Sequence, residues 1–194
     1  TFDPQNYHRR STRLPGYDYT SPAAYFVNLC AWRRECLFGE VVEEENRLSD
    51  LGCIIQQEWL KSKAIRQEIR LFDDEFVIKP NHVHAIVWIV ETVGAHGVRP
   101  DNANPIENPA GRGVFQVNRG AYHAPLHRSP RSLLSFIASF KSSVTHRARS
   151  ELSMTSIWQR NYYEHIIRGE HKWTQIQAYF AHNPAAWQSD PYHT

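Results

Sequence analysis

The stretch Phe76-Val77-Ile78-Lys79-Pro80-Asn81-His82-Val83-His84-Ala85-Ile86-Val87-Trp88-Ile89-Val90 decides the fold. Both of its halves are rich in β-branched and aromatic residues, which favour strands, and a Pro-Asn turn signal separates them. We therefore predict an antiparallel hairpin, with a strand region at 69–78 on one side and a strand at 82–90 on the other. The second strand is apolar at nearly every position except its two histidines.

Periodicity assigns the remaining elements around this hairpin. Apolar residues recur at helical spacing in three segments, and two further runs have the composition of strands. The last helix should stop before Pro184, because a proline disfavours helix at the residue before it. The order β-α-β-β-(insertion)-α-β-α indicates an α+β fold, a ferredoxin-like antiparallel sheet with helices packed on it. The predicted strands span 25–30 and 157–167, and the predicted helices span 47–65, 132 onward and 170–182.

One long segment lacks any such pattern. Residues 91–129 are dense in Gly, Pro and Asn and show no periodicity, which is typical of a flexible insertion. A chain of 194 residues with 41% hydrophobic content is long enough for one sizeable core. We predict a single domain over 1–194 that contains this insertion.

The sequence offers no membrane or secretion signal. No run of about 18 apolar residues occurs, and the first residues lack a charged-then-apolar pattern. Cys30, Cys36 and Cys53 form no C-x-x-C pair, which fits reduced thiols better than a disulfide framework. We expect a cytoplasmic, nucleoid-associated protein with no membrane partner.

The charge is modest in total but uneven along the chain. The formal net charge is +2, yet the segment from Arg128 to Lys172 holds eight Lys or Arg and only three acids. A solvated helix face explains part of this excess, and a polyanionic partner is the other interpretation.

His82 and His84 form the first candidate site. Strand side chains alternate between faces, so both imidazoles leave the same face with their Cα atoms about 6 to 7 Å apart. Two rings so placed can chelate one metal ion. The alternative is two partly exposed histidines on a polar face, which the apolar character of this strand disfavours.

Tyr179 and Asn183 form the second candidate. They are four residues apart in the predicted closing helix and therefore share a face. Tyr179 offers a nucleophile and Asn183 a carbonyl oxygen as a third metal ligand, although a helix tyrosine is also ordinary packing material. Mg²⁺ or Mn²⁺ suits this nitrogen-and-oxygen set with open positions, whereas zinc prefers a closed tetrahedral site.

With these residues in place, the sequence resembles the REP-associated tyrosine transposases, a branch of the IS200-like HUH single-tyrosine transposases of bacterial insertion sequences. The similar segments follow the family's order and cover nearly the whole chain outside the insertion. They are Tyr17-Asp18-Tyr19, Tyr25-Phe26-Val27, Leu37-Phe38-Gly39, Pro80-Asn81-His82-Val83-His84-Ala85-Ile86, Phe140-Lys141-Ser142, the run from Trp158 to Arg168, and Tyr179-Phe180-Ala181-His182-Asn183-Pro184.

The resemblance implies that His82 and His84 bind a divalent ion and that Tyr179 cleaves single-stranded DNA. The covalent 5′-phosphotyrosine would preserve the bond energy, so a free 3′-hydroxyl can reverse the attack and join strands. In the related transposases a Gln four residues after the tyrosine completes the metal site, where this chain has the shorter Asn183. The implied target is a palindromic repeat folded as a hairpin beside a short unpaired sequence, and both a homodimer and a monomer stay open.

Several basic and aromatic residues are candidates for holding that DNA. Cations follow the backbone of unpaired DNA while its bases stack on aromatic rings. Tyr162 and Tyr163 are adjacent in the predicted last strand, so they point to opposite faces, and strand packing is their alternative role. The candidates are Arg9, Arg10, Lys141, Arg147, Arg149, Arg160, Trp158, Tyr162 and Tyr163.

Three other functions compete with a transposase. An HUH replication initiator commonly carries a lysine four residues after the tyrosine, where this chain has Asn183. A domesticated hairpin-binding protein would recognise the same DNA without cutting it. A metalloenzyme that uses His82 and His84 on a different substrate is the third alternative.

Overall fold

The computed structural model describes Leu14, residues 16–43, 45–90, 106–107, 113–114 and 131–181, and Trp187. Most of the predicted insertion lies outside the described residues, and so do Arg9, Arg10 and Asn183. None of the described helices has the length and apolar character that crossing a membrane requires.

A five-stranded antiparallel sheet forms the middle of the molecule. β6 (His82–Ile89) pairs with β1 (Ala23–Cys30), which in turn pairs with β9 (Tyr163–Ile166). On the other side of β6 lie β4 (Ile69–Arg70) and β5 (Phe76–Lys79), which pair with its two ends. The hairpin predicted from the opening stretch is therefore confirmed.

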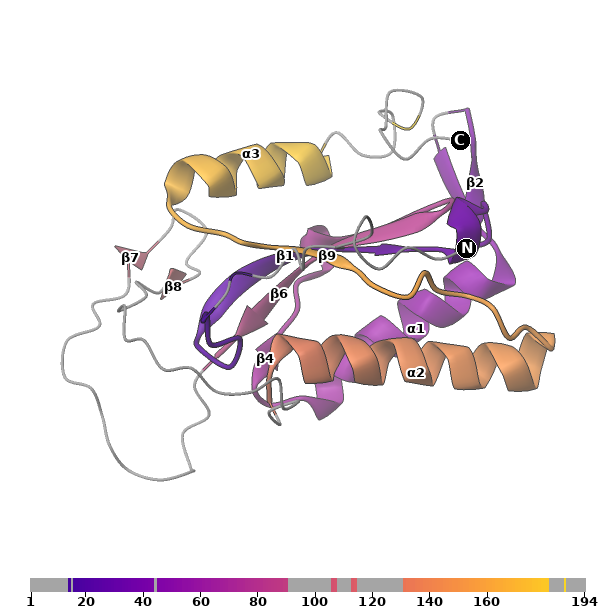
Figure 1. Ribbon diagram of the computed structural model, residues 1–194. Coiled ribbons are helices and arrows are strands. Elements are labelled where there is room, and N and C mark those ends of the chain that lie inside the picture. Colours follow the sequence, from indigo (N-terminus) through magenta and orange to yellow (C-terminus); the bar gives the residue numbers. More distant parts are fainter. Residues whose placement is uncertain are drawn as a thin grey trace, which may run out of the picture.

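Helices cover both faces of this sheet, so the fold is α+β as predicted (Figure 1). α1 (Asp50–Ile65) and α2 (Leu133–Leu152) lie together on one face, and α3 (Glu170–Ala181) lies alone on the other. A serine caps the start of both α1 and α2, because Ser49 Oγ accepts from Gly52 N and Ser132 Oγ accepts from Ser135 N.

The alternation of β6 divides its side chains between two apolar clusters. Val83, Ala85, Val87 and Ile89 belong to the larger core beneath α1 and α2, where Trp59 also stacks on Phe76 with ring centroids 4.5 Å apart. On the other face, Ile86 and Trp88 belong to a smaller cluster that includes Trp173 and Phe180 of α3. The sheet thus separates two different environments.

Two predicted boundaries are wrong. Residues 47–48, expected in the first helix, belong to β3 (Glu45–Leu48), which forms a separate hairpin with β2 (Gly39–Val42). The predicted last strand 157–167 is reduced to β9, preceded by a single bridge between Trp158 and Ala31. Short elements complete the described chain: η1 (Trp32–Arg34), η2 (Asp73–Glu75), β7 (Ile106–Glu107) and β8 (Gly113–Val114).

Candidate active site

The two histidines of β6 lie side by side on the α3 face of the sheet. Their ring centroids are 4.4 Å apart, and both side chains are buried, with 0% of His82 and 5% of His84 exposed. Because β6 is the strand between β1 and the β4–β5 pair, its side chains are held by strands on both sides. The predicted common orientation of the two imidazoles is present in the structure.

Each imidazole is oriented through its Nδ1 atom. His82 Nδ1 lies 2.7 Å from Asn81 Oδ1, and the amide of Asn81 is fixed in turn because its Nδ2 donates to Arg34 O. An amide oxygen only accepts, so His82 Nδ1 carries the proton and Nε2 holds the lone pair. His84 Nδ1 lies 2.6 Å from Tyr179 Oη.

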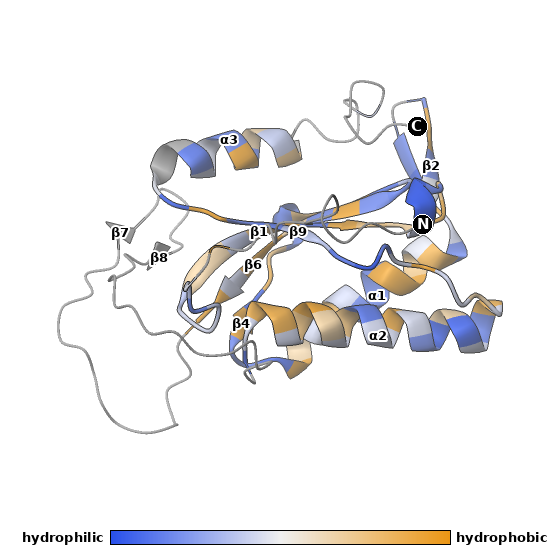
Figure 2. Cartoon of the chain, viewed as in Figure 1, coloured by the Kyte–Doolittle hydropathy of each residue, from blue (hydrophilic) through white to orange (hydrophobic). Residues whose placement is uncertain are grey.

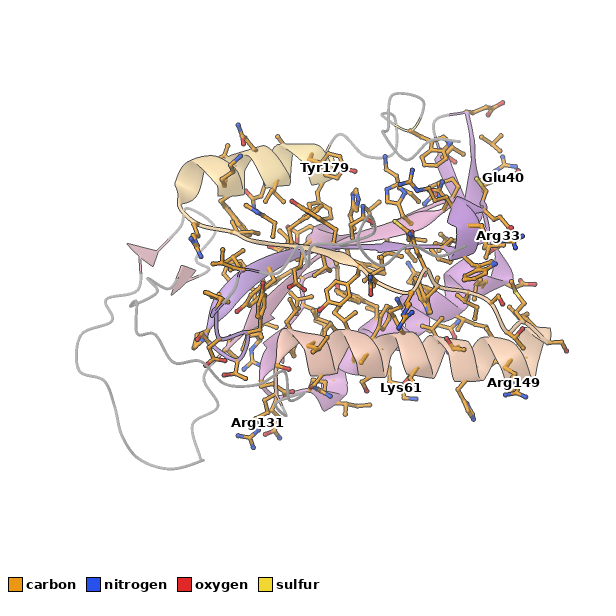
Figure 3. All side chains as sticks on the ribbon, in the orientation of Figure 1. Arg33, Glu40, Lys61, Arg131, Arg149 and Tyr179 are labelled. Carbon is orange, nitrogen blue, oxygen red and sulfur yellow. The ribbon has the colours of Figure 1, made fainter. Side chains whose placement is uncertain are left out.

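α3 delivers Tyr179 to the histidines. Its inward side packs along the sheet, with Trp173 5.2 Å from Trp88 and Phe180 6.2 Å from Phe26, measured between ring centroids. The phenol of Tyr179, near the end of α3, points toward the sheet (Figure 3). The amphipathic period of the helix therefore fixes where the hydroxyl lies.

Lys79 is a residue of this site that the sequence analysis did not identify. It pairs with His82 across the β5–β6 ladder and is only 3% exposed. Its Nζ lies 5.8 Å from the ring centroid of Tyr179 and 5.7 Å from that of Trp187, which is cation–π distance for both rings. The signal was available, since a lysine three residues before His82 in a strand hairpin falls on the same face.

Two further residues of β1 flank the histidines. Asn28 is in register with His84, and Cys30 is in register with His82. Asn28 is buried, and Cys30 Sγ lies 3.5 Å from its Oδ1.

The donor set suits a divalent cation. With both Nδ1 atoms engaged in hydrogen bonds, the Nε2 atoms are the ones that can bind a metal, and the second hydrogen bond of a ligating histidine is what orients its ring. Within the described ranges no group of three or more His, Cys, Asp or Glu gathers as a metal site. The third ligand expected from the sequence, Asn183, lies outside those ranges.

Four of the predicted DNA-binding residues gather elsewhere, on the α2 side of the sheet. Lys141, Arg149, Trp158 and Arg160 line a groove of about 470 Å³. Burial lowers the pKa of Lys141 to about 8. These residues are brought together with one another but not with the histidines.

The other predicted DNA-binding residues are divided. Arg147 forms ion pairs with Glu58 of α1 and Glu151 of α2, so it joins the two helices. Tyr162 packs against the larger core. Tyr163 is 44% exposed on β9, in register with Asn28 and therefore on the face that carries the histidines.

Comparison with known proteins agrees with this architecture. No protein-family model matches the chain. The structure of a REP-associated tyrosine transposase bound to a REP hairpin superimposes with a TM-score of 0.51 at 17% sequence identity, over 89% of this chain and 72% of that one. The chain thus has the α+β fold of the tyrosine transposases.

A relative in sequence defines its family more narrowly. An uncharacterized protein of Haemophilus influenzae is 36% identical over 184 residues, which are 95% of this chain and 92% of the relative. The chain belongs to the same family as that protein.

Proposed function

We propose that the chain is a metal-dependent single-stranded DNA endonuclease and strand transferase that works through a 5′-phosphotyrosine on hairpin-forming repeat DNA. The observation that carries the proposal is the 2.6 Å contact between Tyr179 Oη and His84 Nδ1, beside the second buried imidazole of His82. A tyrosine and two histidines from segments far apart in sequence converge there.

Tyr179 is the nucleophile in this proposal. Its Oη attacks the phosphorus of the scissile phosphodiester, the new O–P bond forms, and the bond to the 3′-oxygen breaks. The phenol proton passes to solvent and the leaving 3′-oxygen takes one up. A free 3′-hydroxyl reverses the same steps and joins a strand without nucleotide hydrolysis.

His82 and His84 would hold the divalent ion through their Nε2 atoms. When bound, Mg²⁺ or Mn²⁺ offsets charge on the phosphate and polarises it. With its Nε2 on the ion, His84 would carry a proton on Nδ1 and would donate it in a hydrogen bond to Tyr179 Oη, which would stabilise negative charge on the attacking oxygen. The hydrogen bond from His82 to Asn81 keeps the second imidazole in the matching tautomer.

The proposed substrate follows from the fold class and from the charges. The solved transposase of the same fold is bound to a REP hairpin. This chain carries exposed cations, Arg149 and Arg160, in a groove that contains no described acidic side chain. Such a groove favours a polyanion over a small neutral substrate.

The rival function is a hairpin-binding protein that does not cut. Such a protein would need cationic contacts to the DNA backbone but would gain nothing from a tyrosine hydrogen-bonded to one of two adjacent buried histidines. Burying polar side chains carries a desolvation cost, so their convergence favours chemistry over binding alone.

Cleavage of end-labelled hairpin DNA with a single-stranded flank, in Mg²⁺ or Mn²⁺, tests the proposal. We expect a product with a free 3′-hydroxyl, and no product when the metal is chelated. His82→Ala and His84→Ala should each lower cleavage at least about 100-fold while hairpin affinity stays within about threefold, because phosphate contacts elsewhere carry affinity.

Lys61→Ala is the control, since Lys61 is exposed on α1, on the other face of the sheet from the histidines. It should cleave at the wild-type rate. Full activity of either His82→Ala or His84→Ala would remove the metal site from the proposal, and binding without any cleavage by the wild type would favour the rival function.

A further inference from the structure

The groove on the α2 side lies on the opposite face of the sheet from Tyr179. Figure 3 shows Arg149 on α2 below the sheet and Tyr179 on α3 above it. The groove has a volume of about 470 Å³, which is in the range of pockets that hold a small ligand or a single nucleotide. Its cationic and aromatic lining residues are Lys141, His146, Arg149, Trp158 and Arg160.

The helical period of α2 separates this lining from the core. Lys141, Thr145 and Arg149 are four residues apart and form one stripe toward the groove. The buried residues of the same segment, Val144 and Ala148, face the core instead. In Figure 2 the start of α2 is mainly orange and its later part mainly blue, so the groove lies along the polar part of the helix.

Lys141 joins the two walls of the groove. Its Nζ donates to Gln159 O at 2.7 Å and lies 5.7 Å from the ring centroid of Trp158. Arg149 and Arg160 are exposed at the rim. The arrangement is an open groove whose lining includes a partly buried cation, which gains more from an anion than a fully solvated cation does.

The segment that forms one wall also leads toward the proposed active site. Gln159 N donates to Cys30 O, and Cys30 is in register with His82. A few residues on, Tyr163 is in register with Asn28, which is itself in register with His84. Adjacent strands lie about 4.8 Å apart, so the exposed Tyr163 is about 10 Å from His84 across the sheet.

We propose that this groove and the β9 edge hold the single-stranded flank of the DNA substrate. Lys141, Arg149 and Arg160 would bind its phosphates on the α2 side, and a base would stack on Tyr163 as the strand reaches the α3 face. The proposal rests on the proposed function, because it uses Tyr179 and the histidines as the end of the path.

Only a flexible strand can follow this path. The route turns around a sheet edge from one face to the other within a few residues of protein. Duplex DNA has a persistence length of about 150 base pairs and resists such a turn, whereas an unpaired strand bends freely and can stack a base on an aromatic ring. The geometry therefore selects single-stranded DNA over duplex.

Metal-free binding measurements with three DNAs separate this proposal from the cleavage chemistry. The DNAs are a hairpin with a flank, the same hairpin without one, and the flank alone. We expect the Arg149→Ala/Arg160→Ala double variant to bind both flank-containing DNAs about tenfold more weakly and the bare hairpin equally well. Loss of two phosphate contacts should also lower the log–log salt slope by about 1.4 for the single strand.

Lys61→Ala is the control variant, since Lys61 is an exposed cation on the neighbouring α1 that does not line the groove. It should leave all three affinities unchanged. Equal losses for the bare hairpin and the flanked hairpin would overturn the proposal, and so would unchanged binding of the flank in the double variant.

Photocrosslinking gives a second measurement that needs no activity. With 5-bromouracil placed along the flank, near positions should crosslink to Tyr163 and outer positions to the peptide that contains residues 141–160. Crosslinks that avoid both peptides would contradict the path. If the wild type formed no covalent adduct yet showed these crosslinks, the proposed chemistry would fail while the binding path stood.

Discussion

Lys79 places a buried positive charge beside the proposed nucleophile. Its Nζ lies 5.8 Å from the ring centroid of Tyr179 and 5.7 Å from that of Trp187, and its backbone pairs with His82. Because Lys79 is buried and lies on a paired strand, its ammonium group has little freedom to move. A fixed cation in a site that largely excludes water stabilises negative charge that develops during the reaction. Lys79 acts in this account by stabilising negative charge on the phenol oxygen of Tyr179.

We predict that Lys79→Met lowers the cleavage rate about tenfold or more, which corresponds to about 1.4 kcal/mol in the barrier. Hairpin affinity should be unchanged, and Lys79→Arg should recover part of the rate because the charge returns. Single-turnover cleavage of labelled DNA measures this. Lys63→Met, which removes an exposed lysine paired with Asp73, is the control. If Lys79→Met cleaved DNA at the wild-type rate, the charge of Lys79 would be unimportant for the reaction.

The lowered pKa of Lys141 predicts that the stability of the protein depends on pH. Burial lowers its pKa in the folded protein from 10.5 to about 8. Between those values the unfolded chain binds more protons than the folded protein, so this group makes the free energy of unfolding rise with pH from about 8 to 10.5. At pH 7 the buried ammonium costs stability.

Lys141→Met should therefore be more stable than the wild type at pH 7, by about 1 to 2 kcal/mol after the loss of the Gln159 hydrogen bond. The difference should shrink as the pH approaches 10. Urea unfolding at pH 7, 8.5 and 10 measures it. A variant that is less stable at pH 7, with a difference that does not change with pH, would contradict the assignment.

For single residues, the direction of a side chain could be predicted from the sequence where the regular alternation of a strand determines it. The H-x-H spacing in a strand was enough to place His82 and His84 on one face. Arg147 is the opposite case, because the face of α2 that meets α1 depends on tertiary packing. A basic residue on a helix cannot be assigned to DNA or to an ion pair from its spacing alone.

Among the elements, α1 begins under a tight packing constraint. A Cβ on Gly52 would lie 2.1 Å from Phe38 O. Phe38 is fully buried and its N–H donates to Pro80 O, so the backbone there has little freedom to move away. The absence of a side chain at Gly52 lets the first turn of the helix approach the segment before β2.

We predict that Gly52→Ala destabilises the protein by about 1 to 3 kcal/mol, since overpacking against backbone outweighs the gain of about 1 kcal/mol in helix propensity. Cys53→Ala, at the next and exposed position of the same turn, should change stability by less than about 0.5 kcal/mol. Thermal unfolding of both variants measures the contrast. A Gly52→Ala variant that is more stable than the wild type would mean that Phe38 yields easily.

Strand and helix types followed from the sequence, but two boundaries did not. Leu48 fits the apolar spacing of α1, but residues 45–48 pair with β2 in a short hairpin, and helical periodicity does not reveal that pairing. β9 pairs only with Tyr25–Asn28, although β1 continues to Cys30, and the isolated bridge between Ala31 and Trp158 lies in a register shifted by two residues. The length of β9 is therefore set by where the two strands stay in register, which the composition of 157–167 does not reveal.

Across the whole molecule, the sheet divides the proposed work between its two faces. The α1 and α2 side carries the larger core and the basic groove, and the α3 side carries the histidines and the tyrosine. Tyr179 is on α3, which packs on the sheet through the smaller apolar cluster. We therefore expect that α3 moves together with a DNA strand bound to Tyr179 while the larger core stays intact.

The most direct measurement of the central claim is covalent adduct formation by Tyr→Phe variants. Each variant is incubated with end-labelled hairpin DNA that carries a single-stranded flank, in Mn²⁺, and run on a denaturing gel. We predict that the wild type, Tyr162→Phe and Tyr163→Phe form a protein–DNA adduct and that Tyr179→Phe forms none, because Tyr179 Oη alone among these phenols lies against His84. An adduct that persists in Tyr179→Phe, or peptide mapping of the nucleotide to Tyr162 or Tyr163, would contradict the account.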